Sequence, residues 1–424
     1  MKKSIFELEG VNQEELKKIF PDIDLHRISI DMTDYGCFSD LYNIVKNNLT
    51  DPRRTSYGNI KHDYFEVITI VIICTIFGIT NTKYIYDFAK NKINEFKIFL
   101  RLKNGIAGYN AFLRYLHMTV VDEIAACRTL WINSLTNIKD KSIDEKLEYN
   151  GKEISIHAQD GKTIIGSGCA SQKIKPTHIV TNINTETGEI LAEVVVDKKS
   201  NEIKANPELI GKIPSLDGIL TTFDAMGCQK DLAQAIHEKD GLYLFQVKEN
   251  QPRLYDDILY TFENKYTEFE KIFSTNRDRF EQRRVYYSND IKYIPGLADW
   301  AGVKAYGLIY KVTISNGTIS TERHLYIMNF DDKALFVKAA RSHWFVENNL
   351  HYIADTVYKE DKCKVRKDRG PSVLNSIRKI GITLFYKISS QLNKTYGVNR
   401  LVNFTRNSLS DLADLVSGNF SILG

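Results

Sequence analysis

The order of predicted strands and helices between residues 148 and 248 limits this chain to a small set of folds. The segment 148–160 alternates apolar Ile154, Ile156 and Ala158 with polar side chains, which is the two-residue period of a strand. Residues 177–197 predict two more strands joined by a turn at 186–188, and a helix follows over 200–213. A strand at 218–225, a helix at 228–240 and a strand at 241–248 complete the series. A hairpin followed by strand–helix alternation indicates an α/β fold, a mixed sheet with helices packed on it.

The pattern changes on both sides of this segment, which predicts four parts. Residues 1–145 space their apolar side chains three and four apart and predict a helical N-terminal domain. Residues 146–264 form the first part of the core, and residues 265–335 predict a β-rich insertion. The helical pattern returns over 336–424, which we assign to the remainder of the core.

Composition favours a cytoplasmic protein without a membrane partner. The 424 residues are 43% hydrophobic and 26% charged, an ordinary globular balance. The six cysteines are scattered and form no C-x-x-C pair, which favours free thiols in a reducing compartment. The longest apolar run, residues 67–79, is shorter than the ~20 residues that span a bilayer. It therefore predicts a buried helix.

Positive charge gathers in one part of a nearly neutral chain. The net charge is +4, yet residues 359–400 hold eleven Lys or Arg and three Asp or Glu, a net of +8. Such a block is a candidate surface for phosphates, and a solvated helix face is the alternative interpretation.

Two aspartates stand at the ends of predicted strands. Asp160 ends the first strand and precedes Gly161, where the chain can turn freely, and Asp224 ends a buried strand. Because the carboxyl ends of neighbouring strands meet at one edge of an open sheet, we expect these carboxylates to lie together. Each alone also fits a turn or a helix cap. Together they would repel without a cation, and Mg²⁺ prefers carboxylate oxygens, so the pair favours a metal site.

A third carboxylate lies on a predicted helix over residues 333–358. His343, Glu347, His351 and Asp355 recur every four residues and form one polar stripe. The adjacent apolar stripe consists of Val346, Leu350, Ile353 and Val357. A helix of this kind packs its apolar side on a sheet, so that Glu347 completes a cage of three carboxylates for two metal ions. Such a pair of ions activates an attacking oxygen and stabilises the leaving oxygen of a phosphodiester.

The histidines of the stripe leave two other interpretations open. A zinc hydrolase would use His343, His351 and a carboxylate, although the H-E-x-x-H order of zinc proteases is absent. Alternatively, both histidines simply pair with Glu347 on a solvated face.

Five short blocks stand in a characteristic order. They are QDGKT at 159–163, KSNEI at 199–203, TFDAMGCQ at 222–229, VKENQ at 247–251 and HWFVENNLH at 343–351. They resemble the signature blocks of DDE transposases of bacterial insertion sequences, in the ISAs group, whose relatives are called H-repeat-associated proteins. DPRR at 51–54 and the apolar helix after it resemble the N-terminal associated domain of that family. The resemblance covers nearly the whole chain from about residue 40.

The resemblance implies a ribonuclease H-like core, interrupted by the β-rich insertion between the second aspartate and the glutamate. It implies that Asp160, Asp224 and Glu347 are the catalytic, metal-binding triad, with Mg²⁺ as the ion and Mn²⁺ as a substitute. The implied reaction is hydrolysis at transposon ends, followed by attack of the new 3′-hydroxyls on target DNA without a covalent protein intermediate. The implied partner is double-stranded DNA, bound by a homodimer or a larger synaptic complex in the bacterial cytoplasm at the nucleoid, with the helical N-terminal domain binding the DNA ends.

The matched blocks also supply candidate DNA contacts. Lysines and arginines suit phosphates, amides suit the DNA backbone or bases, and an aromatic side chain stacks on an unpaired base. The candidates are Lys162, Lys199, Asn201, Gln229, Lys248, Asn250, His343, Trp344, Asn348, His351, Lys364 and Arg366. For Trp344, a place in the core is the alternative. His343 and Ala354 depart from the Arg and Lys that frame the glutamate in the wider superfamily.

The intact triad favours an active enzyme. A domesticated protein of transposase descent that binds DNA without transposing is the alternative that the sequence leaves open.

Overall fold

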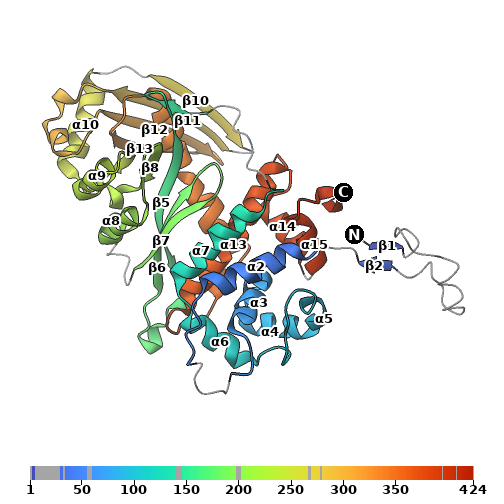
Figure 1. Cartoon of the computed structure of the whole chain (residues 1–424). Coiled ribbons are helices and arrows are strands. Elements are labelled where there is room, and N and C mark those ends of the chain that lie inside the picture. The colour runs from blue at the N-terminus through green and yellow to red at the C-terminus, as the bar shows by residue number, and fades with distance from the viewer. Residues whose placement is uncertain are drawn as a thin grey trace, which may run out of the picture. The chain divides into compact units, whose positions relative to one another are not determined.

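A computed structural model describes residues 2–4, 29–31, 34–54, 60–138, 146–196, 202–265, 269–276, 279–393, 395–406 and 408–423. The chain divides into two compact units, residues 1–141 with 367–424 and residues 142–366 (Figure 1). We had assigned everything from residue 336 onward to the catalytic core. The helices after residue 366 instead cluster with the N-terminal helices, because the long helix α13 packs on α3, α6 and α7.

A nine-stranded sheet forms the frame of the second unit. Its strands are β5 (Ser155–Ile164), β6 (Thr177–Asn184), β7 (Ile190–Val196), β8 (Ile219–Phe223), β9 (Leu242–Val247), β10 (Glu270–Asn276), β11 (Arg279–Ser288), β12 (Ala305–Ser315) and β13 (Thr318–Met328). Their spatial order is β10-β11-β12-β13-β9-β8-β5-β6-β7. β5 runs antiparallel to β6 and parallel to β8, and β8 runs parallel to β9. The part β7-β6-β5-β8-β9 is the expected ribonuclease H-like sheet, which confirms the predicted fold class.

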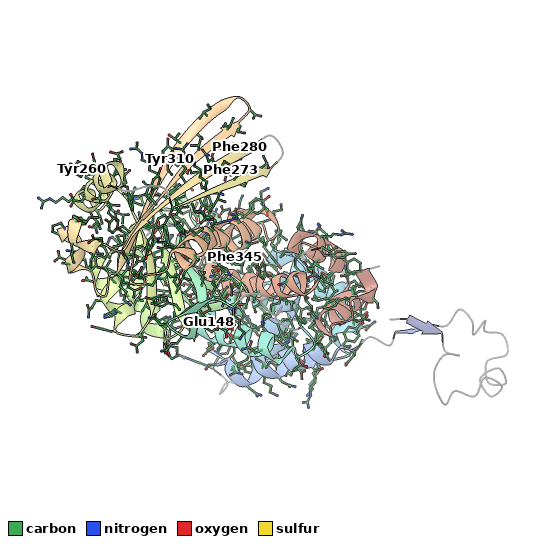
Figure 2. The ribbon with its side chains drawn as sticks, turned by 90° about the horizontal axis from the view of Figure 1, so that it is seen from above. Glu148, Tyr260, Phe273, Phe280, Tyr310 and Phe345 are labelled. Atoms are coloured by element: carbon green, nitrogen blue, oxygen red, sulfur yellow. The ribbon has the colours of Figure 1, made fainter. Side chains whose placement is uncertain are left out.

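The β-rich insertion continues the core sheet instead of forming a separate one. β13 pairs antiparallel with β9, so the strands β10 to β13 extend the sheet beyond its last core strand. Figure 2 shows Phe273, Phe280 and Tyr310 on the long strands of this extension. Shared backbone hydrogen bonds therefore join the insertion directly to the strands that carry the candidate site.

Helices cover both faces of this sheet. α8 (Glu202–Lys212), α9 (Lys230–His237) and α10 (Pro252–Lys265) pack on one face, and α11 (Lys333–Ser342) packs on the other. The alternation along β9 decides which side chain meets which layer. Tyr243 and Phe245 belong to the core with α8, α9 and α10, whereas Leu244 belongs to the core with α11.

The first unit is helical. Its helices are α2 (Gly36–Asn48), α3 (Tyr64–Ile76), α4 (Thr82–Asn91), α5 (Ile93–Phe96), α6 (Tyr109–Met118), α7 (Val121–Ser134), α13 (Gly370–Gln391), α14 (Val398–Thr405) and α15 (Leu409–Val416). The apolar run predicted as a buried helix is α3, in which nearly every side chain is buried. Among the described residues, no helix has both the length and the apolar character needed to cross a membrane.

The basic block over residues 359–400 is not one continuous surface. Arg378, Lys379 and Lys387 lie in α13 and are buried, between 1% and 6% exposed. Those three side chains are therefore part of neither a phosphate-binding surface nor a solvated face. The exposed cations of the block lie outside α13: several, Lys364 among them, precede it, and Arg400 follows it.

Gly307 gives a direct test of how α11 packs on the sheet. A Cβ at this β12 position would lie 2.5 Å from Cζ of Phe336 on α11. Gly307→Ala should therefore lower the apparent melting temperature by several degrees, because overpacking of a core typically costs about 1–3 kcal/mol. Gly296→Ala is the matched control, since a Cβ there meets nothing within 4 Å. Equal melting temperatures for both variants would contradict this packing.

Candidate active site

The register between β5 and β8 brings the two aspartates together. The parallel pairing runs from Ser155 opposite Ile219 to Gln159 opposite Phe223, so Asp160 and Asp224 are the next residues on the two strands. One part of our expectation was wrong, because β5 does not end at Asp160. It continues to Ile164 in antiparallel pairing with β6, and Gly161 lies inside the strand opposite Val180. Asp160 thus lies in the middle of β5, one residue beyond the end of its pairing with β8. Only Asp224 lies at the end of its strand and begins a turn.

The turn after β8 holds Asp224 in place. The Asp224 carboxylate caps a single helical turn, Ala225–Gly227, by accepting the N–H groups of Met226 at 3.0 Å and of Gly227 at 3.2 Å. The side-chain amide of Asn250 donates to the Ala225 carbonyl at 2.6 Å and braces the same turn from the end of β9. The cap interpretation of Asp224 is therefore confirmed, and the metal-site interpretation stays a prediction.

The helix predicted over residues 333–358 is interrupted at the glutamate. α11 ends at Ser342, a wide π-helical turn covers Val346–His351, and α12 spans Tyr352–Thr356. In the wide turn the N–H of Tyr352 donates to the carbonyl of Glu347, five residues back. The expected regular α-helix, with one stripe of side chains every four residues, was therefore wrong for this turn. Turns of this type occur frequently at functional sites.

The polar stripe nevertheless lies along β5 and β8. His343 Nδ1 lies 3.0 Å from Thr222 Oγ1 on β8, and His351 Nδ1 lies 3.4 Å from Asp160 Oδ2 on β5. Asp355 Oδ2 pairs with Lys162 Nζ at 2.6 Å. The four side chains of the apolar stripe are buried, as expected: Val346, Leu350, Ile353 and Val357. Glu347 is exposed, and its negative charge acts on Asp160.

His343 has a structural role in this arrangement. The Thr222 hydroxyl donates its proton to the His157 carbonyl at 3.1 Å, so it accepts the N–H of His343 Nδ1. Burial lowers the pKa of His343 to about 4, which keeps the ring neutral. His343 thereby ties the start of the wide turn to β8, two residues before Asp224. Because His343 contacts Thr222 and His351 contacts Asp160, the two histidines have different partners.

The electrostatics of the aspartates favour a cation. Burial, together with the charges of Asp224, Glu202 and Glu347, raises the pKa of Asp160 to about 7. Burial also raises the pKa of Asp224, the charge of Glu202 adds to this, and the N–H groups of the turn with the charge of Lys248 oppose it. Two neighbouring carboxylates repel each other when both are ionised. A divalent cation such as Mg²⁺, which binds carboxylate oxygens, compensates this repulsion. Within the described part of the chain, no three His, Cys, Asp or Glu side chains have closed into a metal-binding geometry.

Glu202 is the residue of this site that the sequence interpretation missed. It is the first residue of α8 and is 5% exposed, and its charge acts on both aspartates. It lies inside the KSNEI block, from which we selected only Lys199 and Asn201. Those two lie outside the described residues. The sequence did contain a signal for it, because Glu202 is an acidic residue in the first turn of the helix predicted after the hairpin.

The amides and lysines near the triad have contacts within the protein. Lys162 is paired with Asp355, and Asn250 braces the Asp224 turn. Gln229 Nε2 lies 3.4 Å from the Met226 carbonyl of that turn. Lys248 is exposed and lies close enough for its charge to act on Asp224. Of these, Lys248 has the most accessible charge for a phosphate.

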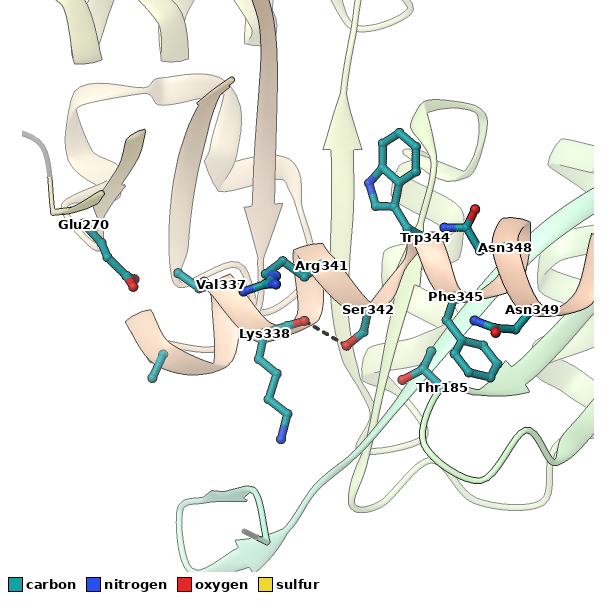
Figure 3. A pocket seen from close by; sticks show the side chains of 11 residues that line it. Thr185, Glu270, Val337, Lys338, Arg341, Ser342, Trp344, Phe345, Asn348 and Asn349 are labelled. Atoms are coloured by element: carbon teal, nitrogen blue, oxygen red, sulfur yellow. Dashed lines mark hydrogen bonds between the residues drawn. The ribbon is translucent and has the colours of Figure 1, made fainter. Parts of the chain in front are cut away.

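Trp344 is exposed, so a place in the core was the wrong alternative. Its side chain is 48% exposed, and Lys311 Nζ lies 5.5 Å from the ring centroid. In Figure 3, Trp344 and Asn348 extend from the same side of their helical segment. Both line a cavity of about 600 Å³ between this segment and Glu270.

A second cavity of about 530 Å³, here called the insertion groove, lies between the insertion strands and α11. Its lining consists of Arg279, Glu281, Arg283, Ile309, Lys311, His324, Tyr326, Ala340, Arg341, Trp344 and Asn348. Four lysine or arginine side chains and one glutamate give this lining a positive balance. Trp344 and Asn348 therefore connect the candidate site to a basic cavity that the sequence did not reveal.

Two further candidates follow the wide turn. Lys364 is exposed, whereas Arg366 Nε donates to the Gly168 carbonyl at 2.9 Å. That hydrogen bond holds the partly buried Arg366 side chain against the loop after β5.

Comparison with known proteins identifies two matching family profiles. The profile described as Transposase DDE domain matches residues 144–381, and the profile described as DDE_Tnp_1-associated matches residues 47–132. In Escherichia coli K12, the "H repeat-associated putative transposase YhhI" is 28% identical over 356 residues, which are 79% of this chain and 88% of that protein. The "Putative transposase YncI" of Escherichia coli O157:H7 is 28% identical over 77% of this chain and 83% of its own length. Among solved structures, a piggyBac transposase synaptic complex with hairpin DNA is similar over 89% of this chain and 81% of its own, with 10% identity and a TM-score of 0.41.

The raised pKa of Asp160 predicts how the metal-free protein responds to pH. In the unfolded chain the pKa of the Asp160 carboxyl is about 3.9. Between about pH 4 and pH 7 the unfolded chain has therefore lost a proton that the folded protein keeps. Stability should therefore fall as the pH rises through this range and stay low above it. Asp160→Asn should melt several degrees above wild type at pH 8 in EDTA, with the difference shrinking towards pH 4. The exposed Asp217→Asn, which loses only the pairing with Lys152, is the control. A wild type at least as stable as Asp160→Asn at pH 8 would contradict the prediction.

Proposed function

Because the chain belongs to the DDE transposases, in the H-repeat group, we propose that it cuts DNA at the ends of its element and joins those ends to target DNA, with Mg²⁺ as its cofactor. The observation that supports this proposal is that Asp160 and Asp224 directly follow paired residues of β5 and β8, while the wide turn that contains Glu347 contacts β5. Two adjacent strands supply the aspartates, and the wide helical turn beside β5 supplies the glutamate.

The three carboxylates are the residues that would hold the ions. When bound, a pair of Mg²⁺ ions supplies activation of the attacking oxygen and stabilisation of the leaving oxygen. The protein contributes the positions of the donors: two backbone N–H groups orient the Asp224 carboxylate, and the pairing of β5 with β6 holds Asp160. His351 lies against the Asp160 carboxylate and can limit its rotation.

The reaction is a pair of displacements at phosphorus. In the first, water attacks the phosphodiester at the element end, the P–O bond to the 3′-oxygen breaks, and that oxygen leaves as a 3′-hydroxyl. In the second, this hydroxyl attacks a phosphodiester of the target, and a target 3′-hydroxyl leaves. No protein side chain forms a covalent bond with DNA in either step.

Binding of DNA is proposed for the surface around the triad. Lys248 beside Asp224 suits a phosphate of the strand being cut, and the insertion groove with its four cations suits the strand that leads away from it. Trp344 at the mouth of the groove offers a stacking face for an unpaired base. Two or more copies of the chain would hold the two element ends together.

Replacement of Glu347 tests the catalytic assignment. Glu347→Ala should reduce Mg²⁺- or Mn²⁺-dependent nicking of DNA that carries the flanking ends of the element by more than about 100-fold, because one metal donor is lost. Binding of the same DNA should change little. Glu186→Ala, which changes a partly exposed glutamate at the β6–β7 turn, is the control and should cleave normally. Metal-dependent cleavage by Glu347→Ala at the wild-type rate would remove Glu347 from the triad, and specific binding without cleavage by wild type would favour the domesticated alternative.

Replacement of Trp344 tests the stacking role. Trp344→Ala should weaken binding of an element end with an unpaired terminal nucleotide by about tenfold, since stacking on an aromatic side chain contributes about 1–3 kcal/mol per base. Affinity for the fully paired end should fall less. Tyr260→Ala is the matched control, because Tyr260 is a 67% exposed aromatic residue on α10. Fluorescence anisotropy with the two DNAs measures the difference, and equal losses for both DNAs would speak against stacking.

A further inference from the structure

A fourth carboxylate is buried against the backbone of the candidate site. Glu202 begins α8, and α8 contacts β6, β7 and the turn that follows Asp224. A Cβ on Gly161 would overlap the Glu202 carboxylate and would lie 2.6 Å from Nε2 of His178. Gly161 directly follows Asp160, so only a residue without a side chain lets this carboxylate reach the strand beside Asp160.

A relay of side chains holds Glu202 in this position. His178 on β6 contacts a Glu202 carboxylate oxygen through Nε2 and the Thr163 hydroxyl through Nδ1, the latter at 2.8 Å. Because an ionised carboxylate only accepts hydrogen bonds, Nε2 carries the proton and donates. Thr163 and His178 stand directly opposite each other on β5 and β6, so the sheet register sets the relay. Among the described residues, the other Glu202 oxygen has no hydrogen-bond donor.

A second set of buried contacts fixes α8 to the same strands. Asn182 on β6 contacts His157 Nδ1 at 3.0 Å and donates to Gln159 Oε1 at 3.2 Å. The Gln159 amide then donates to Asn206 on α8 at 3.0 Å. All four side chains are at most 6% exposed, so buried polar contacts to the part of β5 just before Asp160 orient the helix that carries Glu202.

A purely structural role does not require a charge at this position. A glutamine would accept the same hydrogen bond from His178 and would avoid repulsion by Asp160 and Asp224. Burying a third like charge beside two others costs free energy unless a cation compensates it. Three features are explained if Glu202 faces a cation: an oxygen without a donor in the described part of the chain, the buried position, and the glycine that makes room for the carboxylate.

We propose that Glu202 is a fourth metal-binding carboxylate of this site and that His178 is its positioning residue. This proposal rests on the proposed function, because the ions it concerns are those of the transposase reaction. It assigns the first turn of α8 to the active site, in addition to the ends of β5 and β8 and the wide turn that carries Glu347.

Direct measurement of metal binding tests the assignment without an activity readout. Mn²⁺ binding to the full chain is titrated by electron paramagnetic resonance for wild type, Glu202→Gln, His178→Ala and Asp160→Asn. We expect Glu202→Gln to weaken Mn²⁺ binding by at least about tenfold and His178→Ala to weaken it by a smaller factor. Glu208→Gln is the matched control, since Glu208 lies on the same helix and is exposed, and it should bind as wild type does.

The outcomes separate this inference from the proposed function. If Asp160→Asn loses Mn²⁺ and folded Glu202→Gln binds it with wild-type affinity, Glu202 is structural and the inference is overturned, while the transposase proposal stands. If wild type binds no Mn²⁺, both fail. If circular dichroism shows that Glu202→Gln is unfolded, Glu202→Asp takes its place, because it keeps the charge but withdraws it by one methylene. Wild-type Mn²⁺ affinity of folded Glu202→Asp would then overturn the inference.

Discussion

The parallel pairing of β5 with β8 is the contact on which the rest of the site depends. It ends at Gln159 and Phe223, and the next residue on each strand is an aspartate. A shift of this register by one residue would turn one of the two carboxylates to the opposite face of the sheet. The antiparallel partner on the other side of β5 continues its pairing past Asp160 and places His178 opposite Thr163. The register of β5 with β8 therefore sets the aspartate pair, and the register of β5 with β6 sets the relay to Glu202.

Polar contacts fix the helices that surround the negative charge at this edge. α11 and the wide turn are tied to β8 through His343, and α8 is tied to β5 and β6 through Gln159 and Asn206. These contacts use neutral groups, since burial lowers the pKa of His157 and of His343 to about 4. The carboxylates thus keep their mutual repulsion, and a dication is the natural counter-charge.

The insertion adds a surface without disturbing this centre. Its strands extend the sheet from β9, so the insertion groove is fixed to the core by backbone hydrogen bonds. Its charge is concentrated because Glu281, 9% exposed, pairs with Arg279 and Arg283 and lies 3.9 Å from Lys311, holding the three cations close together. Trp344 stands where the groove meets the segment that carries Glu347. The proposed chemistry and the proposed strand binding therefore share one helical segment.

The sequence by itself determined the class of fold and the identity of the triad candidates, because strand periodicity, helix spacing and short blocks such as TFDAMGCQ are local patterns. It also predicted the buried α3 and the apolar stripe of the glutamate helix. Only the tertiary structure decided that β5 runs on past Asp160, that the glutamate lies in a wide turn, and that Arg378 and Lys379 are buried. Glu202 and the insertion groove belong to this second group. Both depend on residues distant in sequence meeting across strands and helices, and no spacing within a single segment encodes such a contact.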